Sequence, residues 1–331
     1  MSLTLAHIQE AAQRIARYVH RTPVLTSQSL NAIVGAQIFF KCENFQKVGA
    51  FKFRGACNAV FSLSPDEVQR GVATHSSGNH AAALALAAKL RGTVATIVMP
   101  KTAPAIKKAA VASYGGRIIF CEPTLAARES TLAAEVAQSG ATVIHPYNDE
   151  RVIAGQGTAA LELLEEVPNL DAVLTPVGGG GLLSGTAIAV TARSPKTKVF
   201  GVEPEGADDA YRSFKTGYIQ PSLQPKTIAD GLLTSLGDKT FPIIQEKVSD
   251  IVTVSEEGIV SAMRLIWERM KIIVEPSCAV PFAALLERRL DLPGKRVGII
   301  LSGGNVDLDK LPWQHSEPAT YGFAVSSVVN R

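Results

Sequence analysis

Features that would assign this sequence to several common protein classes are missing. The chain has only four cysteines, Cys42, Cys57, Cys121 and Cys278, and no two of them form a CxxC pair. This wide spacing argues against a disulfide framework or a zinc knuckle and favours reduced thiols. No apolar run of about 18 residues occurs, and the first residues lack the apolar core of a signal peptide. We therefore expect a cytoplasmic protein without a membrane partner.

The charges show no strong excess of either sign. Lys and Arg total 33 and Asp and Glu total 30, spread without long blocks, for a formal net charge of +3. A nucleic-acid partner would favour basic residues gathered on one face, so none is expected. Apolar residues make up 46% of the 331 positions, which is an ordinary globular balance and allows one large domain or two moderate ones.

Short apolar segments alternate with stretches of helical periodicity, a pattern typical of βαβ units and parallel sheets. Strands are predicted at 37–42, 72–76, 94–99, 117–121, 142–145, 172–176, 198–202 and 297–301, and helices at 79–90, 124–138 and 182–190. We expect a small mobile α/β domain, 71–148, inserted into a large domain built from 1–70 and 149–315, with 316–331 as a tail. Ligands favour the cleft between two such domains.

Two motifs far apart in the sequence suggest a bound cofactor. Lys52 lies in the segment GAFKFRG, and a lysine amine becomes a nucleophile toward carbonyls when burial or neighbours lower its pKa. An unbroken glycine run, Gly178–Gly181, follows a predicted buried strand and precedes a predicted helix. Without side chains, its N–H groups can turn toward an anion at the helix start. Together the motifs predict an imine between Lys52 and pyridoxal phosphate, with the glycine run holding the phosphate.

Other interpretations of the glycine run are weaker. A dinucleotide fingerprint GxGxxG fails because its third glycine position holds Leu183 or Ser184. A P-loop fails because no Gly-Lys-Ser/Thr follows. A nicotinamide oxidoreductase is thereby disfavoured but stays open, as does a ligand-binding protein without catalysis.

Two further motifs follow predicted strands. Ser76-Ser77-Gly78-Asn79-His80 opens a predicted helix, where free N–H groups suit the α-carboxylate of an amino acid. The alternative is an ordinary N-cap made by Ser77 or Asn79. Ser302 follows the last predicted strand, where its hydroxyl would reach a ring nitrogen of a cofactor; a structural turn is the alternative.

An acidic segment near residue 205 offers oxygen ligands. Glu203 and Asp209, with a backbone carbonyl between them, suit Mg²⁺ or Ca²⁺. The alternative is a solvated acidic loop.

These residues, in this order, resemble the fold-type II pyridoxal-phosphate enzymes, specifically the serine racemase and threonine dehydratase family, which includes threo-3-hydroxyaspartate dehydratases. The similarity runs from about Thr22 to Trp313. It is carried by FFKCE at 39–43, THSSGNH at 74–80, AGQGT at 154–158, IADG at 228–231, WERMK at 267–271 and SGGNVDL at 302–308. The resemblance implies a two-domain α/β fold of the tryptophan synthase β type, a homodimer and a small amino-acid substrate.

The resemblance also implies roles for individual residues. Lys52 and Ser77 would be the acid/base pair on opposite sides of the substrate Cα. The implied cofactor contacts are Lys52, Phe51, Asn79, Gly178, Gly179, Gly180, Gly181, Gly231, Glu275 and Ser302. The implied substrate contacts are Ser76, Ser77, Asn79, His80, Arg128 and Thr234. The implied ligands of Mg²⁺, or of Ca²⁺ or Mn²⁺, are Glu203, Ala207 through its carbonyl, and Asp209.

The implied activity is dehydration, racemisation or both, on β-hydroxy amino acids such as serine, threonine or 3-hydroxyaspartate. A β-replacement enzyme similar to cysteine synthase is the alternative. Val48 and Ala81-Ala82 differ from the residues common in racemases near their nucleotide effector site, so activation by ATP is not expected. The biosynthetic threonine dehydratases carry a C-terminal regulatory domain that has no counterpart here, so feedback by isoleucine is not expected.

Overall fold

The structure, a computed structural model, describes residues 3–76, 78–103 and 105–314. These residues form a six-stranded sheet in the order β1-β2-β10-β7-β8-β9 and a four-stranded sheet in the order β5-β4-β3-β6. The large sheet contains β1 (Val24–Leu25), β2 (Gln37–Cys42), β7 (Ala172–Pro176), β8 (Lys198–Pro204), β9 (Asp250–Val254) and β10 (Arg296–Leu301). The small sheet contains β3 (Val72–His75), β4 (Ala95–Pro100), β5 (Arg117–Cys121) and β6 (Thr142–Val143).

Apart from β1, which runs antiparallel to β2, the paired strands are parallel. All residues of β4 and β7 are buried, as expected of parallel strands covered on both faces by helices. The predicted class, α/β with parallel sheets, is confirmed. The sequence patterns missed β1, which has two residues, and β9, which begins with Asp250 and contains Thr253 among its apolar residues. The strand predicted at 142–145 ends earlier, at Val143.

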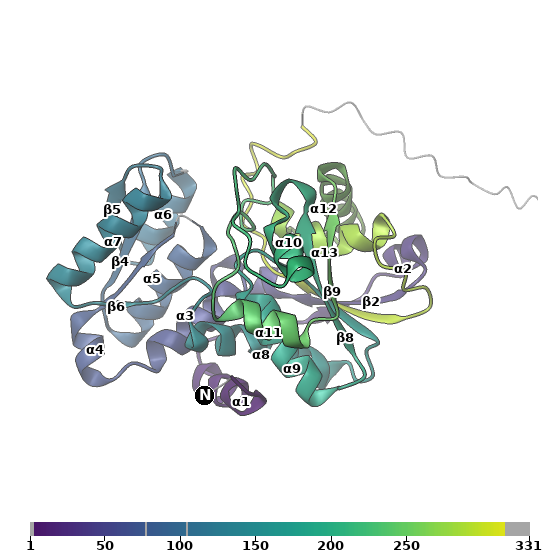
Figure 1. The fold of residues 1–331 in the computed structure, drawn as a ribbon, viewed down its shortest axis with the longest axis horizontal. Coiled ribbons are helices and arrows are strands. Elements are labelled where there is room, and N and C mark those ends of the chain that lie inside the picture. The colour runs from purple at the N-terminus through teal and green to yellow at the C-terminus, as the bar shows by residue number, and fades with distance from the viewer. Residues whose placement is uncertain (1–2, 77, 104, 315–331) are drawn as a thin grey trace, which may run out of the picture.

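Helices cover both sheets, and Figure 1 shows the two sheets as lobes that lie side by side, with α3 near their junction. The helices of the first half are α1 (Leu5–Ile15), α2 (Gln28–Val34), α3 (Lys52–Phe61), α4 (Pro65–Arg70), α5 (Asn79–Arg91), α6 (Ala105–Ser113) and α7 (Leu125–Ser139). Those of the second half are α8 (Glu150–Glu166), α9 (Gly181–Arg193), α10 (Asp209–Thr216), α11 (Thr240–Lys247), α12 (Glu256–Met270) and α13 (Pro276–Leu286). Short 3₁₀ helices occur at Glu43–Phe45, Lys47–Gly49 and Glu205–Ala207.

Glycines bring α3, α8 and α9 into backbone contact. A Cβ added at Gly155 of α8 would lie 2.6 Å from the carbonyl oxygen of Arg54 in α3. A Cβ at Gly185 of α9 would lie 2.6 Å from the amide nitrogen of Gly157 in α8. Because Lys52 begins α3 and Gly181 begins α9, the packing on α8 fixes the distance between the two predicted cofactor motifs.

A buried network of ion pairs also contacts the first turn of α3, through Arg54. The Arg54 guanidinium is fully buried and lies 2.7 Å from Glu43 and 2.7 Å from Glu162 of α8. Lys41 of β2 lies 2.6 Å from the second oxygen of Glu162. Two cations therefore face two carboxylates, so each buried charge is paired.

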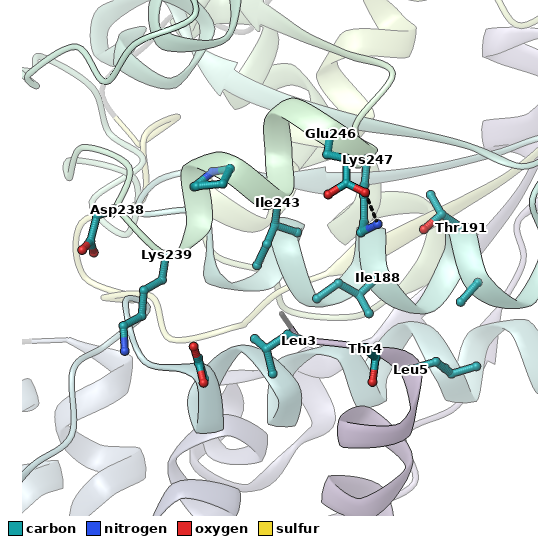
Figure 2. A pocket seen from close by; sticks show the side chains of 13 residues that line it. Leu3, Thr4, Leu5, Ile188, Thr191, Asp238, Lys239, Ile243, Glu246 and Lys247 are labelled. Atoms are coloured by element: carbon teal, nitrogen blue, oxygen red, sulfur yellow. Dashed lines mark hydrogen bonds and ion pairs between the residues drawn. The ribbon is translucent and has the colours of Figure 1, made fainter. Parts of the chain in front are cut away.

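A surface groove of about 580 Å³ opens between residues 3–5, α9 and α11. Figure 2 shows Leu3, Ile188 and Ile243 around it, with the Glu246–Lys247 pair at one side. Of the described residues predicted for the functional site, none lines this groove. Within the described parts of the chain, no helix has the length and apolar character that crossing a bilayer requires. All four cysteines are buried and unpaired.

Candidate active site

Lys52 lies where the two lobes meet. Its Nζ donates a hydrogen bond of 2.8 Å to the carbonyl oxygen of Pro146, which follows the small sheet, and lies 5.2 Å from the centroid of the Phe51 ring. Burial lowers the pKa of this amine to about 8, although the negative charge of Glu275 acts in the opposite direction. An amine with this pKa is unprotonated in a useful fraction of molecules near neutral pH.

The carboxyl end of β10 brings Ser302 next to this lysine. The Phe51 amide donates to the Ser302 carbonyl oxygen at 2.9 Å, and the Gly304 amide donates to the Gly49 carbonyl oxygen at 2.9 Å. Ala50 and Gly303 form an isolated antiparallel bridge between the same segments. Ser302 is 3% exposed. Two segments that lie more than 250 positions apart in sequence are thus side by side.

Asn79, Glu275 and Asn305 form a hydrogen-bonded group beside these segments. The Asn79 side-chain NH₂ donates to both oxygens of Glu275, at 2.9 and 3.2 Å, and its Oδ1 accepts a bond of 2.9 Å from the side chain of Asn305. Burial, and then the charge of Asp230, raises the pKa of Glu275 to about 7. The alternative interpretation of Asn79 as an N-cap is wrong, since Gly78 precedes α5 and Asn79 is its first residue.

The four glycines of the run meet close neighbours. A Cβ at Gly179 would lie 2.3 Å from the ring of Tyr147, and a Cβ at Gly181 would lie 3.0 Å from Tyr147 Cβ. Gly180 has φ +87°, where a side chain is strained. It precedes α9 without a side-chain cap, so N–H groups of the first turn have no partner within the helix.

The remaining predicted residues differ in how they relate to Lys52. Gly231 joins the site, because its carbonyl oxygen would lie 3.2 Å from a Cβ at Gly178. Thr234 lies within reach of the Tyr147 hydroxyl. Arg128 of α7 is partly buried, and its charge contributes, after burial, to the lowered pKa of His75 at the end of β3.

The motif at 76–80 is described only in part, since Ser77 lies outside the described residues. The Ser76 hydroxyl accepts a hydrogen bond of 3.4 Å from the Gly78 amide. His80 is 2% exposed, and its Nε2 lies 3.1 Å from the Ile144 carbonyl oxygen. Burial lowers the pKa of His80 to about 3, so the imidazole is neutral.

The acidic segment forms a separate group. Glu203 lies in β8, one residue before its end, and both Glu203 and Asp209 are fully buried, so a solvated acidic loop is wrong for these two carboxylates. Glu203 accepts N–H bonds from Ala210 and Tyr211, at 3.1 and 2.8 Å. Neither Asp209 oxygen makes a hydrogen bond of ordinary geometry in the described part of the chain, although the nearby Ser222 side chain acts to lower the pKa of Asp209.

The electrostatics of this acidic group suit a cation. Burial raises the pKa of Asp209 to about 6, and burial together with the Asp209 charge raises the pKa of Glu203 well above its usual value. Burial disfavours the ionised forms of Glu203 and Asp209, and the Asp209 oxygens lack ordinary hydrogen bonds. A divalent ion would stabilise both carboxylates. Among the described residues, no group of three or more His, Cys, Asp and Glu side chains has metal-binding geometry, so a backbone carbonyl such as that of Ala207 would be needed.

Sequence patterns missed three contributors to the site. Tyr147 covers two of the glycines, Asn305 holds Asn79, and the Pro146 carbonyl holds Lys52. Residues 144–149 connect β6 to α8, and the only signal there is that the apolar pattern breaks at His145-Pro146. His145 turns this connector, because its Nδ1 accepts the Asn148 amide at 2.9 Å.

The residues present fit pyridoxal phosphate. An amine of lowered pKa, a hydroxyl at the end of β10 and uncapped N–H groups at the start of α9 supply the three kinds of contact that an aldehyde, a ring nitrogen and a phosphate require.

Comparisons with known proteins agree with this interpretation. The chain matches the family model described as "Pyridoxal-phosphate dependent enzyme" over residues 15–303. It is 56% identical to a "beta-hydroxyaspartate dehydratase" of Paracoccus denitrificans (strain Pd 1222) over 303 residues, which cover 92% of this chain and 96% of that protein. It is 54% identical to the "L-threo-3-hydroxyaspartate ammonia-lyase" of Saccharomyces cerevisiae (strain ATCC 204508 / S288c), over 93% of this chain and 94% of that one.

A solved structure is similar throughout. The crystal structure of serine racemase from Dictyostelium discoideum superposes with a TM-score of 0.90 at 52% identity, covering 93% of this chain and all of that one. The chain belongs to the fold-type II family of pyridoxal-phosphate-dependent enzymes.

Proposed function

We propose that this protein dehydrates β-hydroxy amino acids, inverts their configuration at Cα, or does both. Dehydration would convert serine, threonine or 3-hydroxyaspartate into a 2-oxo acid and ammonia. The names of the similar proteins support this range of reactions. The observation that carries the proposal is Lys52, an amine with a pKa lowered to about 8 that lies beside Phe51 and the Ser302 segment.

Lys52 is the proposed base at the substrate Cα. A base works best when its pKa lies near the working pH, and burial brings this amine close to that condition. The Pro146 carbonyl, 2.8 Å away, orients the amine where the two lobes meet. Lys52 would also be the point of covalent attachment for the cofactor.

Other residues would bind and orient the cofactor. The N–H groups at the start of α9 would hold its phosphate, and Ser302 would hydrogen-bond its ring nitrogen. A serine hydroxyl is too weak an acid to protonate that nitrogen. Phe51 would pack beside the ring, and Asn79 would donate to the ring 3-oxygen. When bound, pyridoxal phosphate would withdraw electrons from Cα, which is chemistry that the side chains lack.

Ser77 is the proposed second acid/base, on the face of the substrate opposite Lys52. Returning a proton there would give the other enantiomer, whereas loss of the β-hydroxyl as water and subsequent hydrolysis would give the 2-oxo acid. Ser77→Ala should therefore suppress racemisation more than elimination from the L-substrate. Equal losses in the two reactions would reject the assignment of two bases.

One assay panel tests the function directly. Each stereoisomer of serine, threonine and 3-hydroxyaspartate would be incubated with the holoenzyme, with Mg²⁺ or with a chelator, and both 2-oxo acid and enantiomer would be measured. A 2-oxo acid or an inverted enantiomer from at least one substrate is expected. Absence of turnover throughout, with cofactor bound, would contradict the proposal.

Arg128 is the proposed carboxylate contact of the small lobe. It would engage the second carboxylate of 3-hydroxyaspartate when the lobes close, so Arg128→Ala should reduce turnover of that substrate more than turnover of L-serine. Equal losses would rule out a selective role at the distal carboxylate.

Glu203, Asp209 and the Ala207 carbonyl are proposed to hold Mg²⁺, or Ca²⁺ or Mn²⁺. The Asp209 oxygens, which lack ordinary hydrogen bonds, and the raised pKa values of both carboxylates support a cation there.

The arrangement of the whole protein is also a proposal. We propose a cytoplasmic homodimer in which residues 71–148 move against a large domain of 1–70 and 149–315. Light scattering of the purified holoenzyme measures the mass, and a monomer at working concentration would contradict the dimer.

A further inference from the structure

Glu275 stands out among the predicted site residues because of the direction of its side chain. It immediately precedes α13 at the N-cap position, yet its carboxylate makes no capping hydrogen bond to that helix. It is 4% exposed and instead meets Asn79 of the small lobe. The Glu275 carboxylate therefore binds a side chain of the small lobe instead of capping α13.

Both oxygens of Glu275 are in use. Oε1 accepts the Asn79 side-chain NH₂ at 2.9 Å, and Oε2 accepts the same NH₂ at 3.2 Å and the Asn305 amide at 3.1 Å. An ionised carboxylate only accepts hydrogen bonds, so Asn79 must present its NH₂ group to Glu275 rather than its oxygen.

The hydrogen bond to the Asn79 side-chain oxygen favours the same orientation of the amide. The Asn305 side-chain NH₂ donates to Asn79 Oδ1 at 2.9 Å and to the Val48 carbonyl oxygen at 2.7 Å. The chain of bonds from Val48 through Asn305 and Asn79 to Glu275 therefore has one consistent direction. A 180° rotation of the Asn79 amide would put NH₂ against NH₂ at one end and oxygen against oxygen at the other.

We infer that Glu275 is a positioning residue, which acts through Asn79: its two oxygens share one N–H of the Asn79 side chain, so the other N–H is directed to where it would meet the ring 3-oxygen of the cofactor. The inference rests on the proposed function, since it takes Asn79 as a cofactor contact. It replaces direct contact between Glu275 and the cofactor, the role implied by family resemblance, with an indirect one.

Glu275→Gln is the sharpest variant because it keeps the size of the side chain. The glutamine NH₂ must replace one of two oxygens, and each oxygen already accepts an N–H group. The resulting donor–donor contact is relieved when Asn79 rotates and presents its oxygen to the glutamine. The NH₂ group would then no longer be available to the ring 3-oxygen.

The test measures cofactor binding and the spectrum of the bound cofactor, neither of which requires turnover. Cofactor-free wild-type and variant proteins are titrated with pyridoxal phosphate at about pH 8.5, above the pKa of Glu275, so that its carboxylate is ionised. We expect Glu275→Gln to bind about tenfold more weakly. We also expect a changed ratio of the two absorption bands that report the state of the ring 3-oxygen.

Two further variants keep the test decisive. Asn305→Ala removes the donor to Asn79 Oδ1 at an exposed position, so folding is not at risk, and should change the band ratio in the same direction but less. Asn79→Ala should match Glu275→Gln in affinity, and combining the two should add nothing, because both act through one contact.

The outcomes separate this inference from the proposed function. A wild-type protein that binds no pyridoxal phosphate would contradict the proposed function itself. Wild-type binding together with unchanged affinity and spectrum in Glu275→Gln would overturn the inference alone. A lowered melting temperature with an unchanged spectrum would overturn it as well, because Glu275 would then only join the two lobes.

Discussion

At the scale of single residues, the site depends on where one amine is buried. Lys52 begins α3, and its ammonium form has one carbonyl partner and the partial compensation of Glu275. Burial disfavours a charge more strongly than these two contacts favour it, so the pKa falls. The same environment explains why this lysine, among many, suits attack on an aldehyde.

This pKa predicts selective labelling. In the cofactor-free protein, acetylation by limiting anhydride should show a midpoint near pH 8 for Lys52, because its pKa is lowered to about 8. Exposed lysines titrate at about pH 10.4. Peptide mass spectrometry across the pH range measures each site. Glu275→Gln should lower the Lys52 midpoint further, since the carboxylate raises it. A midpoint near that of exposed lysines would show that Lys52 is well solvated.

Sequence patterns predict residues with site chemistry, but they do not predict the residues that hold them in place. Lys52 and the glycine run can be predicted because the segment GAFKFRG and four consecutive glycines are distinctive sequence patterns. Tyr147 and Asn305 do not, since their roles arise from contacts with Gly179 and Asn79 across the fold. The burial of Glu203 and Asp209 was equally hidden, because an acidic segment looks solvated until its neighbours are known.

At the scale of helices, α8 acts as a spacer between the lysine and the glycine run. Its glycines let α3 and α9 approach to backbone contact, closer than side chains would allow. The segment AGQGT at 154–158 carries the family resemblance, but it does not predict this contact, because helical periodicity does not reveal which glycines touch another backbone.

Gly155→Ala should disturb this spacing. The new Cβ would lie 2.6 Å from backbone atoms of α3, which cannot rotate away as a side chain can, so α3 must shift. We expect a loss of about 1–3 kcal/mol in the free energy of unfolding. Weaker binding of pyridoxal phosphate should accompany it, because Lys52 moves relative to α9.

Gly116→Ala is the matched control for this substitution. Its new Cβ would meet side chains of Val111 and Ala85 in the small lobe, 2.8 and 3.0 Å away. It should destabilise the protein without weakening cofactor binding. Equal effects of the two variants on cofactor binding would refute the spacer role of α8. Chemical denaturation and cofactor titration measure the two quantities.

The segment at the start of α10 predicts a cation-dependent stability. Burial raises the pKa of Asp209 to about 6, so without a cation this group favours folding most at low pH and loses that contribution as pH rises through about 6. Saturating Mg²⁺ or Ca²⁺ should reverse the trend, because the cation binds the ionised form. A cation at about 100 times its dissociation constant adds about 2.7 kcal/mol.

Asp209→Asn separates this effect from general charge loss. The variant should melt at least as high as wild type without a cation near neutral pH, and should gain little when Mg²⁺ or Ca²⁺ is added. Asp208→Asn is the control, because Asp208 pairs with Arg212 at 2.8 Å and its side chain is 40% exposed. If melting temperatures of wild type and Asp209→Asn rose equally with the cation, the site would lie elsewhere.

At the scale of the whole molecule, the lobes share a helix and several polar contacts. α3 belongs to the apolar cluster of the small lobe through Phe53, Ala56 and Val60, and it also packs on α8 of the large lobe. The split into a small unit and a large one was visible in the alternation of strands and helices. The double role of α3 could not be predicted. Its residues are buried on several sides, but the sequence does not indicate which elements cover each side.

A surface ion pair also joins the lobes. Lys107 of α6 pairs with Asp230, which lies in the segment 217–239 between α10 and α11, and both side chains keep contact with solvent. An exposed pair is worth about 1 kcal/mol or less, so its loss should hardly change the melting temperature. If the lobes must approach each other to enclose the substrate, the same small energy should appear in KM instead, as a rise of about two- to fivefold.

A double-mutant cycle tests this division of effects. Lys107→Ala, Asp230→Ala and the double variant should raise KM by the same factor, because the second substitution finds the pair already broken. Raising the ionic strength should move wild type toward the variants. The control is the pair of Lys101 and Glu122, which lies wholly within the small lobe with both side chains 64% exposed, and whose removal should leave KM unchanged. Additive rises, or an equal rise in the control, would mean that the Lys107–Asp230 pair does not report on the approach of the lobes, because only a contact that crosses between them should register substrate enclosure.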